Sequence, residues 1–183
     1  MQKNILRQLN FLIYLALMLV AVTLQSTIFK YFPLNYFQPD VLLVLTVYFG
    51  FKRDNIEGGL FVILASLILE AHSGTGRFFF LMAYTYCFVI AKVISMVLVV
   101  PNRVTVILIT IALSVFWKLC MLFLLGLAGR AGNGVLHFLI YLFPSTLTQA
   151  VTAAFCLHWF NVIDLRTYKD EHSEDEYDIN REF

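Results

Sequence analysis

The stretch LILEAHSGTGRFFFLMAY, from Leu67 to Tyr84, ends one apolar run with a carboxylate, a histidine and two glycines, and then begins a second apolar run. Apolar runs separated by short polar turns are typical of membrane helices, because backbone groups in hydrocarbon must be hydrogen-bonded within the chain. The whole sequence has this character: 60% of its 183 residues are hydrophobic, 14% are charged, and the mean hydropathy is +0.79. This composition excludes an ordinary water-soluble domain and predicts an integral membrane protein.

Outward from this stretch, similar polar turns divide the chain into six apolar segments, each expected to be a transmembrane helix. The segments are Phe11–Phe29, about Pro39–Arg53, a segment capped by Asp54 or Asn55 that runs to about His72, Phe78–Val100, Val104–Leu127 and Leu136–Phe160. The predicted fold is therefore all-α, with a single six-helix transmembrane domain over residues 1–163. Residues 164–183 are rich in acids, and we expect them to form a disordered cytoplasmic tail.

The lysines and arginines lie mainly on one side of the predicted bundle. One side has Lys3, Arg7, Lys52, Arg53, Arg103, Arg166, Lys169 and Arg181, and the other has Lys30, Arg77 and Arg130. Because cytoplasmic segments carry the excess of positive charge, we expect both termini in the cytoplasm. The second segment is only about 22 Å long at 1.5 Å per residue, so local thinning of the bilayer, snorkelling by Lys52 and Arg53, or burial by neighbouring helices must close the gap.

Three ionisable residues fall inside the predicted helices: Glu70, Lys92 and Lys118. A charge at membrane depth costs roughly 2.5 to 3.5 kcal/mol on insertion scales, so each is expected to face protein and to find a partner. By helical rise either lysine can reach Glu70, and Arg77 is a third candidate. Two interpretations remain: a site that binds a ligand or relays protons, and a charge pair that fixes helix register. We favour the second, because a proton path usually has several carboxylates or histidines.

Other polar positions predict how the helices begin and pack. Pro39 suits the first turn of the second helix, and the Asp40 carboxylate suits its positive N-terminus. Gly58 and Gly59 offer a smooth face for close helix contact. A polar stripe in the last segment contains Ser145, Gln149, Thr152 and Cys156.

The sequence predicts no catalytic residue, no metal site, no cofactor and no nucleic-acid binding. The loops GTG and GLAGRAGNG lack the lysine and serine that end a phosphate-binding loop. Cys87, Cys120 and Cys156 lie singly in apolar runs and are read as small core residues. The histidines are not spaced to share a metal.

Four motifs carry a resemblance to a known family: LQSTIF (24–29), QPDVLLVLTVYFG (38–50), EGG (57–59) and LILEAHSGTG (67–76). In this order and spacing the first half of the chain resembles the rod-shape-determining protein MreD family. The second half is similar to that family only in helix count and in lacking extramembrane domains. The positions that match the family pattern are Gln25, Ser26, Pro39, Asp40, Gly59, Glu70 and Gly74, which the resemblance implies are structural or partner-contacting residues.

The resemblance implies a non-enzymatic scaffold subunit of the bacterial cell-elongation complex. It would be located in the inner (cytoplasmic) membrane, in contact with membrane lipid. Its partner would be MreC, with the RodA glycosyltransferase and a class B penicillin-binding transpeptidase in the same assembly and MreB filaments linked indirectly. Such an assembly supports side-wall peptidoglycan synthesis and rod shape. The single transmembrane helix of MreC is then expected to pack near Gly58 and Gly59 or on the segment Phe78–Val100.

An alternative function comes from another class. The MreD fold is similar to that of the substrate-binding S components of energy-coupling-factor vitamin transporters, which would hold a small ligand near Glu70, His72 and the GTGR loop. S components carry two spaced small residues on the first helix for the transport partner, of the alanine-x-x-x-tryptophan kind, and this chain lacks them. Here only Ala16 and Ala21 are available, and no tryptophan precedes Trp117.

Overall fold

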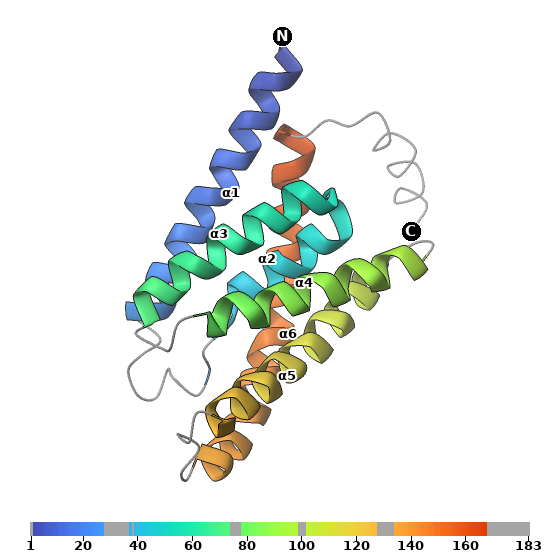
Figure 1. The fold of residues 1–183 in the computed structure, drawn as a ribbon. Coiled ribbons are helices and arrows are strands. Elements are labelled where there is room, and N and C mark those ends of the chain that lie inside the picture. Colours follow the sequence, from blue (N-terminus) through green and yellow to red (C-terminus); the bar gives the residue numbers. More distant parts are fainter. Residues whose placement is uncertain are drawn as a thin grey trace.

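The computed structural model describes residues 2–27, 37, 39–73, 78–98, 102–127 and 134–167. These form six helices, which confirms the predicted all-α class (Figure 1). The helices are α1 (Gln2–Thr27), α2 (Val41–Lys52), α3 (Asn55–Ser73), α4 (Phe79–Val97), α5 (Arg103–Leu127) and α6 (Gly134–Thr167).

The short helix α2 is the centre of the packing, since it contacts each of the other five helices. Every residue from Leu42 to Gly50 is buried. A helix enclosed on all sides needs no polar face, and the sequence VLLVLTVYFG has almost none. Twelve residues extend about 18 Å, less than the roughly 30 Å of a bilayer core, so α2 is a buried core helix that the others surround.

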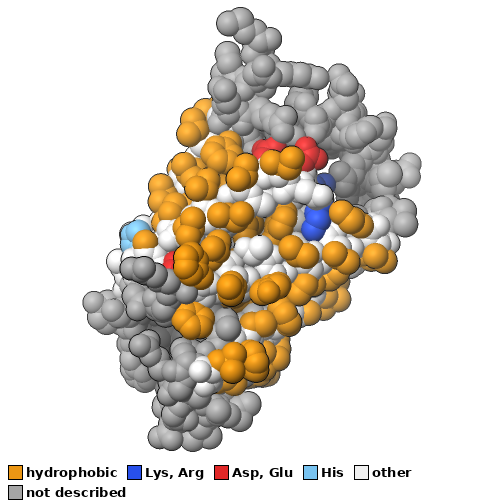
Figure 2. Space-filling model, viewed as in Figure 1, with side chains coloured by type: hydrophobic (Ala, Val, Ile, Leu, Met, Phe, Trp, Pro, Cys, Tyr) orange, Lys and Arg blue, Asp and Glu red, His pale blue; other side chains and the backbone are white. Residues whose placement is uncertain are grey.

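Three helices in the described part of the chain are long and apolar enough to cross a membrane. They are Asn55–Ser73, Phe79–Val97 and the first 18 residues of α5, Arg103–Cys120. Large hydrophobic side chains lie exposed on many helices and cover much of the face in Figure 2. Contiguous apolar surface of this extent is typical of a protein in contact with lipid.

The start of α1 and the end of α6 lie at the same end of the molecule (Figure 1). Asn10 of α1 is hydrogen-bonded to Thr167 of α6, and Arg53 after α2 is hydrogen-bonded to the same asparagine. On the other side of α2, Lys92 near the end of α4 donates to the Arg53 carbonyl. This end of the bundle thus joins the start of α1 and the ends of α2, α4 and α6.

Several helix limits differ from those predicted. Helix α1 begins at Gln2 rather than Phe11, and α2 begins at Val41, so Pro39 precedes the helix instead of forming its first turn. Helix α6 continues past Phe160 to Thr167. The sequence places residues 164–167 in the acidic tail, whereas in the structure they continue α6, where Asp164 is bonded to Tyr14 and Tyr48. Residues 168–183 lie outside the described part of the chain.

Candidate functional site

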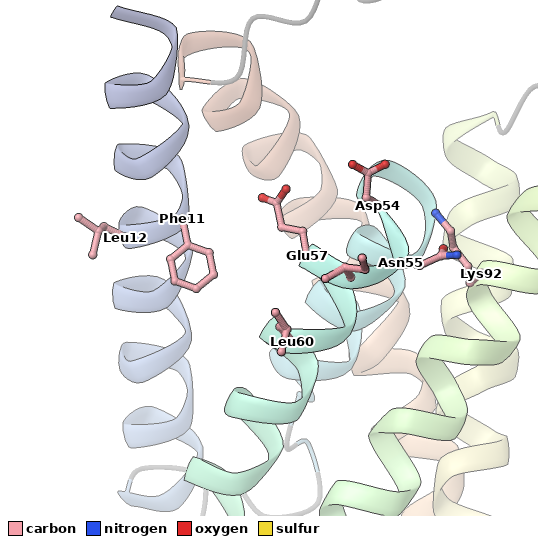
Figure 3. A pocket seen from close by; sticks show the side chains of 8 residues that line it. Phe11, Leu12, Asp54, Asn55, Glu57, Leu60 and Lys92 are labelled. Carbon is pink, nitrogen blue, oxygen red and sulfur yellow. The ribbon is translucent and has the colours of Figure 1, made fainter. Parts of the chain in front are cut away.

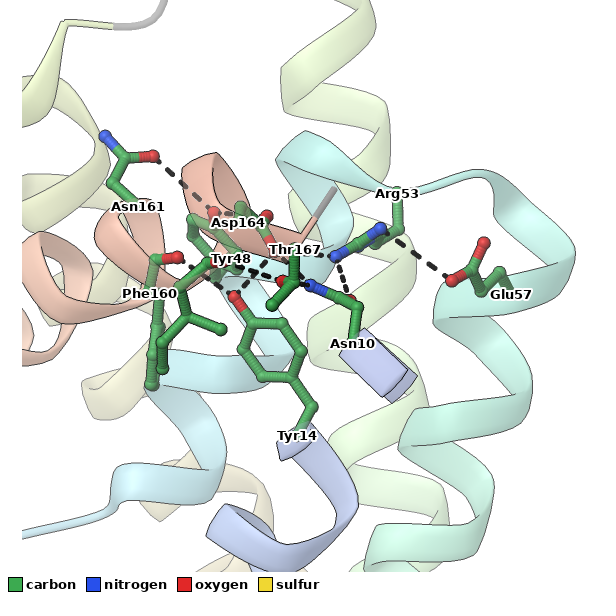
Figure 4. A network of polar contacts seen from close by, with 10 residues as sticks. Asn10, Tyr14, Tyr48, Arg53, Glu57, Phe160, Asn161, Asp164 and Thr167 are labelled. Atoms are coloured by element: carbon green, nitrogen blue, oxygen red, sulfur yellow. Dashed lines mark hydrogen bonds and ion pairs between the residues drawn. The ribbon is translucent and has the colours of Figure 1, made fainter. Parts of the chain in front are cut away.

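Two buried polar clusters lie at opposite ends of α2. The Asp164 cluster consists of Asn10, Tyr14, Tyr48, Arg53 and Asp164, near the C-terminus of α2 (Figure 4). The Asp40 cluster consists of Gln25, Asp40, Tyr84, Lys118, Ser145 and Gln149, near its N-terminus. Each cluster contains one carboxylate and one basic side chain from a different helix.

The Asp164 carboxylate accepts hydrogen bonds from side chains of α1, from one side chain of α2, and from Arg53, which directly follows α2. Its Oδ1 atom accepts from Asn10 Nδ2 at 3.0 Å, from Tyr14 Oη at 2.9 Å and from Arg53 Nη2 at 2.7 Å. Its Oδ2 atom accepts from Tyr48 Oη at 2.6 Å. Donors from α1 and α2 therefore converge on one side chain of α6, which fixes the three helices relative to one another.

Arg53 is 3% exposed, so its side chain is buried and does not snorkel to the surface. Its Nη2 atom also donates to Asn10 Oδ1 at 2.6 Å, and its Nη1 atom lies 3.8 Å from Glu57 Oε1. The guanidinium stands 5.8 Å from the centre of the Tyr14 ring and 5.7 Å from that of Phe49. Of the three alternatives for the short second helix, burial by neighbouring helices is the one that the structure shows at Arg53. Helix α2 ends beside the buried carboxylate of Asp164, and the planar guanidinium suits a buried ion pair.

Asp40 caps α2, as the sequence predicts. Its Oδ1 atom accepts from the Leu43 amide at 2.9 Å, and its Oδ2 atom accepts from Tyr84 Oη at 2.7 Å. The side-chain amide of Gln149 forms two bonds with the Asp40 backbone, accepting from its N–H at 2.8 Å and donating to its carbonyl at 2.9 Å. A helix end inside the bundle cannot reach water, so these bonds satisfy groups that would otherwise be unpaired.

The Asp40 cluster extends to helices α1 and α5. Gln25 Nε2 donates to the carbonyl of Pro39 at 2.7 Å. Lys118 Nζ donates to Ser145 Oγ at 2.8 Å, one helical turn from Gln149. The hydrogen-bond partner of Lys118 is therefore a hydroxyl of α6 and not the Glu70 carboxylate that the sequence suggested.

Lys92 also does not pair with Glu70. Its Nζ atom donates to the carbonyl of Arg53 at 2.7 Å, and Ser95 Oγ donates to that of Gly50 at 3.2 Å. Carbonyls at the C-terminus of a helix have no partner within it, and a nearby cation stabilises them. Helix α4 therefore caps the C-terminus of α2.

Glu70 lies near the end of α3, where its Oε1 atom accepts from the backbone N–H of Phe79 at 3.1 Å. Its Oε2 atom is buried and has no hydrogen-bond partner in the described ranges. Among those residues no ion pair joins Glu70 to Lys92 or Lys118, so neither lysine is the expected partner of Glu70. The third candidate, Arg77, lies outside the described residues. Glu70 connects α3 to the first turn of α4.

Gly58 confirms the predicted close helix contact. A Cβ atom there would lie 2.9 Å from Phe88 Cε2 of α4, and one at Gly59 would lie 3.7 Å from the same ring. Gly58 is therefore covered by α4 and offers no surface to a partner. Ser26 lies in α1, but its side chain is not among those described, and Gly74 lies outside the described residues.

Sequence reasoning missed the Asp164 cluster. Asn10 and Tyr14 are four residues apart and share a helix face, which was a usable signal for a polar contact. Arg53 and Asp164 each stand where an apolar run ends, and this position is equally typical of solvent-exposed charges. Only the packing of three helices reveals that they meet.

The carboxylate of each cluster, Asp164 or Asp40, is hydrogen-bonded to protein donors through both of its oxygens. Within the described ranges, no group of three or more histidines, cysteines or acids is arranged to hold a metal ion. The arrangement supports a role in positioning helices. Comparison with known families, curated proteins and solved structures finds no match to this chain.

Proposed function

We propose that this protein is a non-enzymatic inner-membrane scaffold of the MreD type, which binds MreC and supports side-wall peptidoglycan synthesis and rod shape. In this proposal all six helices form the membrane domain and both termini are cytoplasmic. RodA and a class B penicillin-binding transpeptidase belong to the same assembly, and MreB filaments are linked indirectly.

The observation that carries the proposal is that separate family-like motifs meet in one cluster. Gln25 of the LQSTIF motif donates to the carbonyl of Pro39, which belongs to the QPD motif. The next residue, Asp40, is bonded to Tyr84 of α4 and Gln149 of α6. The matching residues are thus used to hold the bundle together, which is the role expected of them in a scaffold.

The exposed face of α4 supports a docking site for the transmembrane helix of MreC. Five large side chains repeat on this face at helical spacing: Met82, Tyr86, Val89, Val93 and Met96, each at least 50% exposed. The glycines of α3 are less suitable, because Gly58 is already packed against Phe88. Within the bilayer a partner helix gains from van der Waals packing on such a surface.

A photocrosslinking amino acid at Tyr86 or Val93 tests this placement. Capture of MreC from both positions, and not from the exposed Leu108 of α5, is the expected result. Capture from Leu108 alone would move the docking surface to α5, and no capture from any of the three positions would contradict docking on α4.

Depletion of the protein in its host tests the biological role. Rod-shaped cells are expected to round and swell, because side-wall synthesis loses its membrane scaffold. Normal shape together with a new vitamin requirement would contradict the proposal and support the S-component alternative. Complementation by the wild-type chain provides the control.

A further inference from the structure

A groove with a volume of about 1080 Å³ opens between α1 and the start of α3 and extends to α4 (Figure 3). Phe11 and Leu12 of α1 and Leu60 of α3 give it an apolar wall. Asp54, Glu57 and Lys92 add charges of both signs. Neither the Asp40 cluster nor the proposed MreC face on α4 includes this groove.

The apolar wall is open to the surroundings. Leu12 is 57% exposed and Leu60 is 56% exposed, and both belong to helices whose outer faces are apolar. Figure 3 shows Phe11 pointing from α1 toward the gap beside α3. A hydrocarbon chain that lies along this wall would cover surface that the protein leaves uncovered.

The polar part of the groove lies around the first turn of α3. Asp54 and Glu57 are the acids there, the Glu57 carboxylate lies 3.8 Å from Arg53 Nη1, and Lys92 approaches from α4 (Figure 3). The Lys92 ammonium has three N–H donors, and the Arg53 carbonyl uses one of them. Donors therefore remain for an anionic group, while the exposed Asp54 carboxylate can accept from a cationic one.

We propose that this groove binds one zwitterionic aminophospholipid, with its phosphate on Lys92, its ammonium on Asp54, and an acyl chain along Phe11, Leu12 and Leu60. Charge complementarity selects this occupant. An anionic phosphatidylglycerol headgroup would meet the Asp54 carboxylate without bringing a cation. A phosphatidylcholine headgroup brings a cation that has no N–H to donate. A partner helix with one basic residue would pair with Asp54 and leave Lys92 without an anion.

Native mass spectrometry of the full chain in mild detergent tests the proposal. The protein is exchanged into phosphatidylethanolamine, phosphatidylglycerol or phosphatidylcholine with identical acyl chains, and the bound lipid is counted as detergent activation removes the micelle. We expect one phosphatidylethanolamine to remain bound, with occupancy about tenfold above that of either other lipid, since each headgroup contact is a charge-assisted hydrogen bond.

Two pairs of variants locate the site. Leu60→Trp fills the groove, and Leu108→Trp places the same side chain on the exposed face of α5. Lys92→Gln removes the phosphate partner, and Lys52→Gln removes an exposed lysine at the same end of the bundle. Leu60→Trp and Lys92→Gln are expected to reduce occupancy, whereas the two control variants leave it unchanged.

Three outcomes would overturn the proposal: equal retention of the three lipids, preference for phosphatidylglycerol, or equal effects of Leu60→Trp and Leu108→Trp. A polypeptide that co-purifies and is lost in Leu60→Trp while lipid binding is unchanged would assign the groove to a protein partner instead. The measurement uses the isolated chain, so it is independent of whether the protein binds MreC.

Discussion

At the scale of single residues, the buried ion pair between Arg53 and Asp164 has the largest energetic consequence. The Arg53 side chain is 2% exposed and that of Asp164 is 14% exposed, and their nearest atoms are 2.7 Å apart. Removing one member leaves an uncompensated charge in a low-dielectric environment. Removing both leaves hydroxyl and amide groups that can still bond to one another, as Tyr14 already does with the Phe160 carbonyl.

Because the two side chains form an ion pair, we expect the effects of replacing them on the free energy of unfolding to be non-additive. Arg53→Met and Asp164→Leu should each lower the free energy of unfolding by about 3 to 5 kcal/mol, and the double variant should lose less than the sum. Unfolding of the purified protein in mixed micelles with increasing denaturing detergent measures the difference. Lys52→Met, which changes an exposed neighbour, serves as the control. Additive losses in the double variant would show that the two side chains act independently.

We expect substitutions of Glu70 to change the free energy of unfolding less, and to do so through a lost hydrogen bond rather than a lost charge. Glu70→Gln keeps an acceptor for the Phe79 N–H, whereas Glu70→Leu removes it. The leucine variant should therefore be less stable than the glutamine variant by about 1 kcal/mol in the same unfolding measurement. Equal stability of the two variants would exclude a role for this bond.

At the scale of secondary structure, α2 shows how a short helix is kept inside a membrane bundle. Asp40 and Gln149 satisfy its N-terminus, and Lys92 and Ser95 satisfy carbonyls at its C-terminus. A glycine allows α4 to approach it closely, since a Cβ atom at Gly50 would lie 2.8 Å from Ala91 Cβ and 3.4 Å from the Lys92 backbone nitrogen.

The close approach at Gly50 predicts a packing defect on substitution. Gly50→Ala should destabilise the protein by about 1 to 3 kcal/mol, because the new methyl group meets a neighbouring helix that cannot yield easily. Gly126→Ala is the matched control, because a Cβ atom there meets nothing within 4 Å. A thermal-stability assay in detergent compares them. Equal midpoints for the two variants would contradict the observed contact between α2 and α4.

The helices themselves were largely predictable from the sequence. Apolar runs between polar turns gave six helices, and Asp40 was correctly assigned to the start of the second, because helix length and capping are local properties. The partners of Glu70, Lys92 and Arg53 were not predictable. The rise per residue estimates how deep a side chain lies only if the helices run parallel to one another. The observed contacts depend instead on where the helices cross and on where the short helix α2 ends.

At the scale of the whole molecule, the start of α1 and the end of α6 share one end of the bundle, as the contact between Asn10 and Thr167 shows. In a membrane bundle of this arrangement the start of α1 and the end of α6 lie on the same side (Figure 1). The distribution of lysine and arginine favours the cytoplasm for that side.

Reporter fusions test this orientation. Green fluorescent protein at the C-terminus should fluoresce, and alkaline phosphatase there should be inactive, because the first matures in the cytoplasm and the second needs an oxidising compartment. Alkaline phosphatase inserted between α5 and α6 should be active and provides the control. Activity of the phosphatase at the C-terminus would reverse the assigned orientation.

The most direct test of the proposed function is identification of the proteins that accompany this chain. The tagged protein is purified in mild detergent from native membranes, and co-purifying proteins are identified by mass spectrometry. The proposal predicts MreC together with the transpeptidase, and an Asp40→Leu variant should lose them if the Asp40 cluster maintains the fold that they bind. Recovery of paired ATPases with a membrane coupling subunit would contradict the scaffold function and identify a transporter component.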